Sequence, residues 1–162
     1  MSVGPGCRGV APGRTAGAIC MEIPSLKVSG DVASIDLRRF FESYLTALNS
    51  HDFDRMDTFY KRSIRFQLFD SVQNFDEIIG GLNGIRDAFP DWRWDLLEVL
   101  FAGDLIAARY ADVGTHTGPF QGIEPTGKKV EALEFAVYRI VDERISEMWS
   151  SLDVRELIRQ LS

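Results

Sequence analysis

The spacing of apolar residues in the first half of the chain predicts three helices. Apolar residues three and four apart give one amphipathic face between residues 34 and 48, formed by Leu37, Phe40, Phe41, Tyr44, Leu45 and Leu48. A second, short helix is expected over residues 53–60. A third is expected over residues 75–88, where Asn74 can cap the first turn. Gly80, Gly81 and Gly84 lie within it and indicate either close packing or a loose helix.

Apolar and polar residues alternate more often in the rest of the chain, which predicts strands. Residues 63–69 form one such segment, and residues 92–101 and 105–113 form a hairpin around a short turn. Residues 129–140 and 145–151 predict a second hairpin, and a last short helix begins after Asp153. Helices followed by mainly antiparallel strands predict an α+β fold, with the helices on one face of a curved sheet.

Composition limits how this pattern is divided along the chain. With 162 residues, of which 45% are hydrophobic, we expect a single domain over residues 31–162. Residues 1–30 begin with a stretch rich in Gly, Ala and Pro, and we expect a disordered tail there. No segment approaches the ~20 consecutive apolar residues of a membrane span. We therefore expect a soluble, cytoplasmic protein that does not bind a membrane.

Charge and metal-binding residue types exclude several functions. The formal net charge is −6, which argues against nucleic acid as a partner, because such binding requires clustered Lys and Arg. Both cysteines lie in the first 20 residues, and the chain has only two histidines, without the paired spacing of zinc ligands. We therefore expect neither a disulfide framework nor a tightly bound metal.

The segment GIEPTGKK, residues 122–129, differs by one residue from a phosphate-binding P-loop. Glu124 would place a negative charge among the phosphates, and Pro125 lacks an N–H donor. The residues that follow are β-branched and aromatic, so they predict a strand and not the helix whose N-terminus binds phosphate. We interpret the segment as a connection between strands.

A longer stretch resembles a known family. The motif GTHTG occurs at residues 114–118, F-x-G-I-x-P-T-G-K at residues 120–128 and YRI-x-D at residues 138–142. Trp149 precedes Asp153 as a tryptophan before a capping aspartate. With these motifs, the chain from about residue 37 to residue 161 resembles the SnoaL-like polyketide or ester cyclase family.

The resemblance implies a cone-shaped α+β barrel like that of nuclear transport factor 2, with a short C-terminal helix. It also implies catalysis without a cofactor and a homodimer formed through the exposed sheet face. Cyclases of this family close a ring with a buried Asp late in the final strand, helped by a His on the preceding strand. The corresponding positions here are Ser150 and Ala136, so both usual catalytic residues are missing.

Three other residues are candidates for proton transfer. The resemblance puts Ala136 on the cavity side, and the period of two then sends Glu134 to the same side, where an apolar cavity would raise its pKa. Glu134 could instead pair with a buried Arg such as Arg109 or lie in water at the rim. Asp112, on the neighbouring strand, could pair with Glu134 or face solvent. His116 could exchange protons at the cavity mouth or bond to the backbone.

The remaining candidates would contact the substrate. They are Tyr44, Tyr60, Phe66, Trp94, Tyr110, Tyr138, Met148 and Ser150. Ser146 is also expected on the cavity face of the last strand, with Trp149 on the other side. The sequence thus predicts a small acid/base enzyme, a cyclase, isomerase or dehydratase, acting on an apolar or polycyclic small molecule. The alternative is a non-catalytic ligand-binding or assembly module that has lost its chemistry.

Overall fold

The computed structural model describes residues 33–162, so the expected tail at residues 1–30 lies outside the described residues. Its helical elements before the sheet are α1 (Ala33–Asn49), the 3₁₀ helix η1 (Phe53–Arg55) and α2 (Met56–Phe59). The strands are β1 (Tyr60–Leu68), β2 (Ser71–Gln73), β3 (Arg93–Ala102), β4 (Leu105–Thr115), β5 (Lys129–Val141) and β6 (Arg144–Ser150). The helix α3 (Phe75–Ala88) precedes β3, and α4 (Val154–Leu161) ends the chain.

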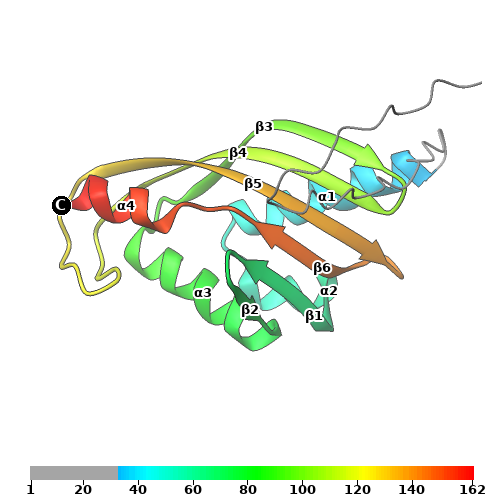
Figure 1. Cartoon of the computed structure of the whole chain (residues 1–162), viewed down its shortest axis with the longest axis horizontal. Coiled ribbons are helices and arrows are strands. Elements are labelled where there is room, and N and C mark those ends of the chain that lie inside the picture. Colours follow the sequence, from blue (N-terminus) through cyan, green and yellow to red (C-terminus); the bar gives the residue numbers. More distant parts are fainter. Residues whose placement is uncertain (1–32) are drawn as a thin grey trace, which may run out of the picture.

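The six strands form a single curved sheet in the order β2-β1-β6-β5-β4-β3 (Figure 1). Strands β1 and β6 are parallel, and every other neighbouring pair is antiparallel. The two predicted hairpins are therefore present as β3–β4 and β5–β6. The parallel pair joins them to the first strand, so residues far apart in the sequence line one interior.

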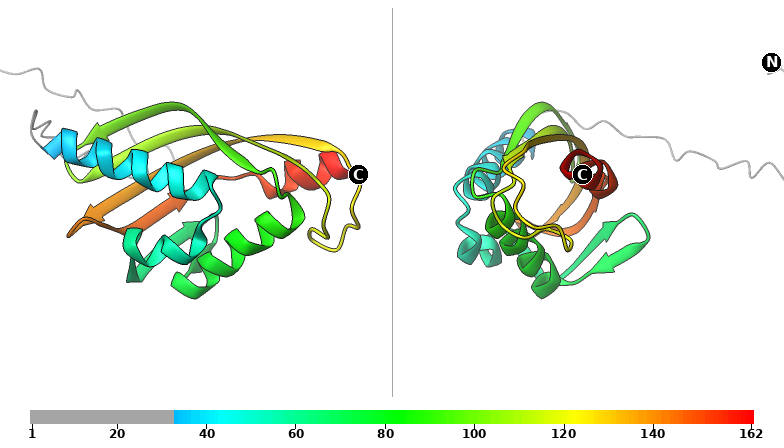
Figure 2. Two further views of the ribbon diagram at one scale, coloured as in Figure 1. Left: turned by 180° about the vertical axis from the view of Figure 1, so that it is seen from behind. Right: turned by 90° about the vertical axis from the view of Figure 1, so that its left-hand side faces the viewer.

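The helices close the concave side of the sheet. Helix α1 packs on β3, α3 packs on β1 and α4 packs on β5. Seen along the long axis, the strands curve around an interior that α1 and α3 cover from the opposite side (Figure 2). This arrangement confirms the predicted cone-shaped α+β fold. No helix in the described residues is both long and apolar enough to span a membrane.

Helix α3 has the predicted bounds because its ends are encoded locally. The side chain of Asn74 accepts hydrogen bonds from the backbone N–H groups of Asp76 and Glu77, and the Glu77 side chain accepts one from the backbone of Asn74. The glycines of α3 are not sites of close packing, since a Cβ at Gly80, Gly81 or Gly84 would have no atom within 4 Å.

The first strand differs from the prediction at its start. Tyr60, predicted as the last residue of a helix, begins β1 and pairs with Ile145 of β6. A helical pattern over residues 53–60 does not reveal this pairing, because it involves a strand more than eighty residues away. The short strand β2 has only three residues and was not predicted.

The last strand contains an irregularity that moves Ser146. The register of β5 and β6 shifts between Arg139 and Ile140. As a result Ile145 and Met148 are both buried, although they are three residues apart, and Ser146 bonds to the backbone oxygen of Arg139. The prediction that Ser146 lies on the cavity face was therefore wrong, because a regular period of two fails across a bulge.

Candidate functional site

A cavity of about 400 Å³ lies between the concave face of the sheet and helix α3. This volume is in the usual range of small-molecule sites. Its lining consists mainly of aromatic and aliphatic side chains together with Gly81 and Gly84 of α3. The apolar and aromatic members include Tyr44, Leu48, Tyr60, Phe66, Leu68, Ile78, Leu82, Ile85, Trp94, Phe120, Tyr138, Met148, Leu152 and Val154.

Polar groups in the cavity lie at two places. Glu134 and Ser150, from β5 and β6, are buried on the sheet side. Gln73, which ends β2, and Gln121, in the β4–β5 loop, also line the cavity and are more exposed. No Lys, Arg or His is among the lining residues. The cavity therefore offers uncharged hydrogen-bonding groups and a single carboxyl group.

Strand register positions the carboxyl group of Glu134. On β5, the alternation of buried and exposed residues turns Ala132, Glu134 and Ala136 toward the interior. Ala136 lies directly opposite Ser150 on β6. The Ser150 hydroxyl donates a hydrogen bond to Glu134 Oε1 across the two strands. The carboxyl group of Glu134 therefore lies beside the Ser150 hydroxyl in the wall of the cavity.

Asp112 is a second buried carboxyl group, beside Glu134. It lies on β4 opposite Ala132 of β5 and opposite Trp94 of β3, and its side chain is inaccessible to solvent. No N–H or hydroxyl group of the described chain donates to either of its oxygens. Glu134 is the group that it faces, and the two carboxyl groups can hydrogen bond only when one of them carries a proton.

This environment raises the pKa of both carboxyl groups. For Asp112 the largest cause is burial, followed by the negative charge of Glu134. For Glu134 burial again raises the pKa, while hydrogen bonds from Asp112 and Ser150 oppose the rise because they stabilise the carboxylate. The two carboxyl groups therefore titrate as a pair, and both of their protons are released above the ordinary pH range of carboxyl groups.

Four tyrosines form two hydroxyl pairs in the same interior. Tyr44 of α1 and Tyr60 of β1 have their hydroxyl oxygens 2.7 Å apart. The hydroxyl oxygens of Tyr110 and Tyr138 are 3.0 Å apart. Tyr44, Tyr60 and Tyr138 line the cavity, whereas Tyr110 is not in the lining. Burial raises the pKa of all four, so they are neutral hydrogen-bond donors at physiological pH.

His116 lies outside the cavity lining. Its ring is fully buried against Phe89 and Phe120, and Nδ1 accepts a hydrogen bond from the backbone N–H of Thr126. Its backbone bonds to Gly127 and Lys128, so the residue fastens the two ends of the β4–β5 loop. The segment GIEPTGKK completes this loop and leads into strand β5, not into a helix.

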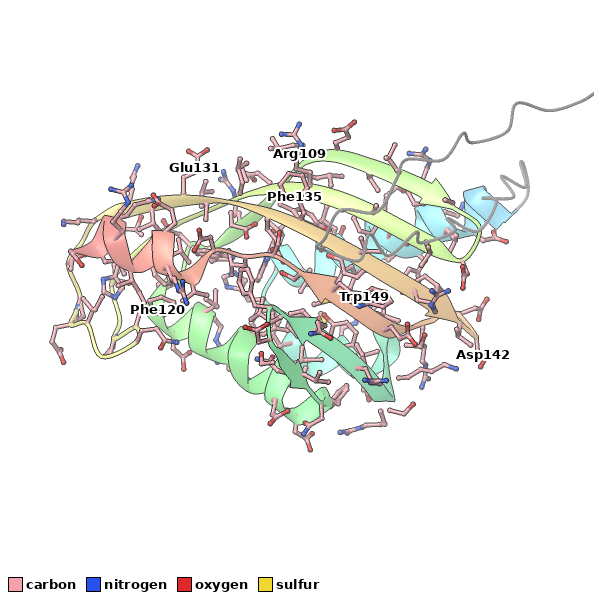
Figure 3. The ribbon with its side chains drawn as sticks, in the orientation of Figure 1. Arg109, Phe120, Glu131, Phe135, Asp142 and Trp149 are labelled. Carbon is pink, nitrogen blue, oxygen red and sulfur yellow. The ribbon has the colours of Figure 1, made fainter. Side chains whose placement is uncertain are left out.

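The outer face of the sheet carries Arg109, the alternative partner considered for Glu134. Figure 3 shows Arg109 and Phe135 projecting away from the interior. On that face, Nε of Arg109 lies 3.7 Å from Oε2 of Glu98. Trp149 is likewise partly exposed there. Glu134 therefore neither pairs with Arg109 nor lies in water.

The structure brings most of the candidate substrate contacts into one cavity. Seven of the eight line it, namely Tyr44, Tyr60, Phe66, Trp94, Tyr138, Met148 and Ser150. Tyr110 is the exception. The cavity face of α3 was not among the predicted contacts, although its apolar residues Ile78, Leu82 and Ile85, spaced four and three apart, were a usable signal. Among the described residues no three His, Cys, Asp or Glu side chains gather as metal ligands do.

Comparison with known proteins gives one family. The model of the family described as SnoaL-like polyketide cyclase matches residues 36–161. No curated protein sequence matches the chain.

Solved structures with the same fold come from several bacteria. IdmH of Streptomyces antibioticus, a proposed polyketide cyclase, is 25% identical with a TM-score of 0.67, over 76% of this chain and 96% of IdmH. AclR of Streptomyces galilaeus, a proposed hydroxylase, is 24% identical with a TM-score of 0.73, over 78% and 81%. A SnoaL-like polyketide cyclase of Agrobacterium tumefaciens is 24% identical with a TM-score of 0.65, over 78% and 98%.

Proposed function

Because the chain belongs to the SnoaL-like polyketide cyclase family, we propose that it is a small acid/base enzyme acting on an apolar small molecule without a cofactor. The observation that carries this proposal is the buried pair of Glu134 and Asp112, with Glu134 open to a cavity of about 400 Å³. A carboxylate in an apolar site is a stronger base than one in water, so Glu134 can remove a proton from carbon. The reaction class is that of a cyclase, isomerase or dehydratase.

In this proposal Glu134 and Asp112 have different roles. Glu134 takes a proton from a carbon atom next to a substrate carbonyl group and later returns it. Asp112 keeps its own proton and donates it in a hydrogen bond to Glu134, which stabilises the charged form of the base. Ser150 does the same from β6. His116 has no part in this chemistry, since it lies outside the lining.

The positions of the family's usual catalytic residues support this reading. Ala136 and Ser150 face each other across β5 and β6, and Ser150 lines the cavity. The resemblance implies that relatives carry a His and an Asp at these places. Glu134 is two residues from Ala136 on the same face, and its carboxyl group bonds to Ser150. Glu134 of β5 thus places a carboxyl group next to Ser150, the position on β6 where relatives carry the Asp.

The lining also favours a neutral substrate. Without Lys, Arg or His in the cavity, a free carboxylate or phosphate group would be buried without a counter-charge beside Glu134. A ketone, ester or phenol meets no such penalty. We propose an aromatic or polycyclic compound with several carbonyl oxygens, whose rings contact Phe66, Trp94 and Met148.

The second candidate function is a ligand-binding module without catalysis. The absence of the usual Asp and His at Ser150 and Ala136 favours it. Native mass spectrometry of the purified protein would identify a small molecule that is retained through purification. Recovery of one unchanged compound, combined with a protein that catalyses no proton exchange, would support the binding module.

We further propose a homodimer formed through the outer face of the sheet. Large apolar side chains on that face are exposed, among them Leu97, Leu100, Leu133, Phe135 and Trp149. Monomeric proteins rarely expose contiguous apolar patches of this kind. The family resemblance points to the same interface.

The proposed chemistry can be tested before the natural substrate is known. The bicyclic ketone 2-tetralone carries acidic hydrogens next to its carbonyl group, and their exchange with D₂O can be followed by NMR. We expect the wild-type protein to accelerate this exchange and Glu134→Gln to lose the acceleration. Glu131→Gln is the matched control, because Glu131 lies on the same strand and is exposed. Equal rates in wild type and Glu134→Gln would remove Glu134 as the base.

A further inference from the structure

The hydroxyl pair of Tyr44 and Tyr60 has one proton that no protein group accepts. Each hydroxyl carries a single proton, and the 2.7 Å bond between the two oxygens uses one of the two. Neither oxygen has another hydrogen-bond partner among the described residues. Both side chains are buried and both line the cavity. The remaining O–H therefore needs an acceptor within the cavity, either water or a ligand that replaces it, because a buried donor without a partner costs stability.

The free proton of the pair can belong to either tyrosine, because each hydroxyl can donate or accept the bond between them. In both arrangements one O–H group remains available to the cavity. The hydroxyl that donates within the pair also strengthens the other as a donor, since hydrogen bonds in a chain polarise one another.

The base and this donor act on the same space. Glu134 and both tyrosines line one cavity, and the negative charge of Glu134 raises the pKa of Tyr44 and of Tyr60. The ring centroids of Tyr44 and Tyr60 are 5.8 Å apart in an edge-to-face contact, which fixes the position of both hydroxyls. A rigid donor in the same cavity as a base can stabilise negative charge that develops on a substrate oxygen.

We propose that the hydroxyl pair of Tyr44 and Tyr60 binds a carbonyl oxygen of the substrate and stabilises the enolate that Glu134 generates. This inference rests on the proposed function of Glu134. The C–H bond next to the carbonyl breaks, its proton goes to Glu134, and the electron pair moves onto the oxygen that the hydroxyl pair holds. The enolate carbon then attacks a second carbonyl carbon of the same molecule. The new alkoxide takes the proton back from Glu134, so no co-reactant is consumed.

The test is a binding measurement with an enolate mimic. 4-Nitrophenolate has a planar ring and one anionic oxygen, and its visible absorption band reports hydrogen bonding to that oxygen. We use the full chain with Glu134→Gln as the parent, because this change removes the charge that would repel the anion and prevents proton transfer. The uncharged methyl ether 4-nitroanisole serves as the ligand control, since it fills the same space without an anionic acceptor.

Replacement of both tyrosines by Phe in this parent should weaken 4-nitrophenolate binding about tenfold or more, the usual effect of losing a hydrogen bond to a charged acceptor. Tyr44→Phe and Tyr60→Phe should each weaken binding less than the double change, because the remaining hydroxyl can still donate to the anion. Binding of 4-nitroanisole should change little in any of them. If the double variant does not fold, the two single variants replace it, and at least one of them should weaken 4-nitrophenolate binding.

Three results would overturn the inference. They are unchanged 4-nitrophenolate affinity in the tyrosine variants, an equal loss for both ligands, or no binding of 4-nitrophenolate to the parent. None of them depends on turnover. Failure of the proposed function would appear instead as a lack of 2-tetralone exchange by the wild-type protein while 4-nitrophenolate still binds through the tyrosines.

Discussion

At the scale of single residues, the carboxyl pair should make folding stability depend on pH. Burial raises the folded-state pKa of Asp112 and of Glu134, so the folded protein holds protons that the unfolded chain releases near pH ~4. The stabilisation is complete below that pH and is lost as pH rises toward the folded-state values. Each such group contributes a slope of about −1.4 kcal/mol per pH unit between its unfolded and folded pKa.

Asp112→Asn should therefore flatten the decrease in stability with pH. The amide keeps the shape of the carboxyl group and can still donate to Glu134, but it does not titrate. We expect the slope of unfolding free energy against pH to fall to about half, because one of two buried titrating groups remains. Urea unfolding at several pH values measures this. A slope identical to that of the wild type would mean that Asp112 does not hold its proton in the folded protein.

Ser150→Ala should move the titration of Glu134 upward. The Ser150 hydroxyl stabilises the charged form of Glu134 and so lowers its pKa. Without that hydrogen bond, the carboxylate forms at a higher pH, and the acid limb of 2-tetralone exchange should shift in the same direction. Ser151→Ala, a change in a neighbouring serine that bonds to Phe135 instead, should leave the limb in place. A downward shift in Ser150→Ala would refute the assigned hydrogen bond.

The position of a side chain was predictable from the sequence only where the alternation within a single strand determines it. The period of two on residues 129–140 is enough to place Glu134 with Ala136 and Tyr138 on the buried face. The partnership with Asp112 depends on the register between β4 and β5, which a single sequence does not contain. The hydroxyl pair of Tyr44 and Tyr60 was equally hidden, because it joins a helix to a strand.

At the scale of elements, the turn between β5 and β6 contains backbone strain. Asp142 and Glu143 have φ values of 50° and 58°, in the left-handed region that favours glycine. Glu143→Gly should therefore stabilise the protein by about 1 kcal/mol, as measured by the denaturant midpoint. Glu143→Ala is the matched control and should give no such gain, because Ala retains the Cβ. If both changes stabilise the protein equally, the cause is the removal of the Glu143 charge and not the relief of backbone strain.

Two glycines in different elements should respond in opposite ways to a methyl group. A Cβ at Gly118 would lie 2.1 Å from the backbone oxygen of Asp87, so Gly118→Ala must displace the loop from the end of α3. We expect a loss of several kcal/mol. Gly80→Ala places its methyl group in open space within α3 and should stabilise the helix by up to about 1 kcal/mol. Thermal unfolding of the two variants measures both effects. A lower unfolding temperature in Gly80→Ala would contradict the open space found around Gly80.

Elements with local end signals were the most predictable. The capping box at Asn74 and the cap at Asp153 define where α3 and α4 begin, and both are legible in the sequence. The start of β1 at Tyr60 was not, because its parallel pairing with β6 overrides a helical pattern. The bulge in β6 was equally invisible, and with it the true orientation of Ser146.

At the scale of the whole molecule, the proposed dimer depends on the apolar outer face. Phe135 lies near its centre on β5 and is 56% exposed. Phe135→Glu would place charges against each other in a two-fold interface and should give a monomer in light scattering. Phe69→Glu is the matched control, since Phe69 is equally exposed but lies between β1 and β2. A monomeric wild type, or dimers in both variants, would contradict this interface.

The fold as a whole followed from the order of helices and strands together with the family motifs. The cavity did not, since its volume depends on the glycines of α3 and on the β4–β5 loop, whose contribution to the lining has no simple sequence signal. Function follows from the cavity and its carboxyl pair more than from the fold, because the same fold serves many purposes.

The central claim is that Glu134, held in a buried carboxyl pair, transfers protons in the cavity. The most direct test is the rate of 2-tetralone exchange by the wild-type protein as a function of pH. We predict that the rate rises with pH and has its midpoint well above ~4.3, the ordinary pKa of Glu, because burial raises the pKa of Glu134. A midpoint at the ordinary value, or a rate independent of pH, would contradict the account.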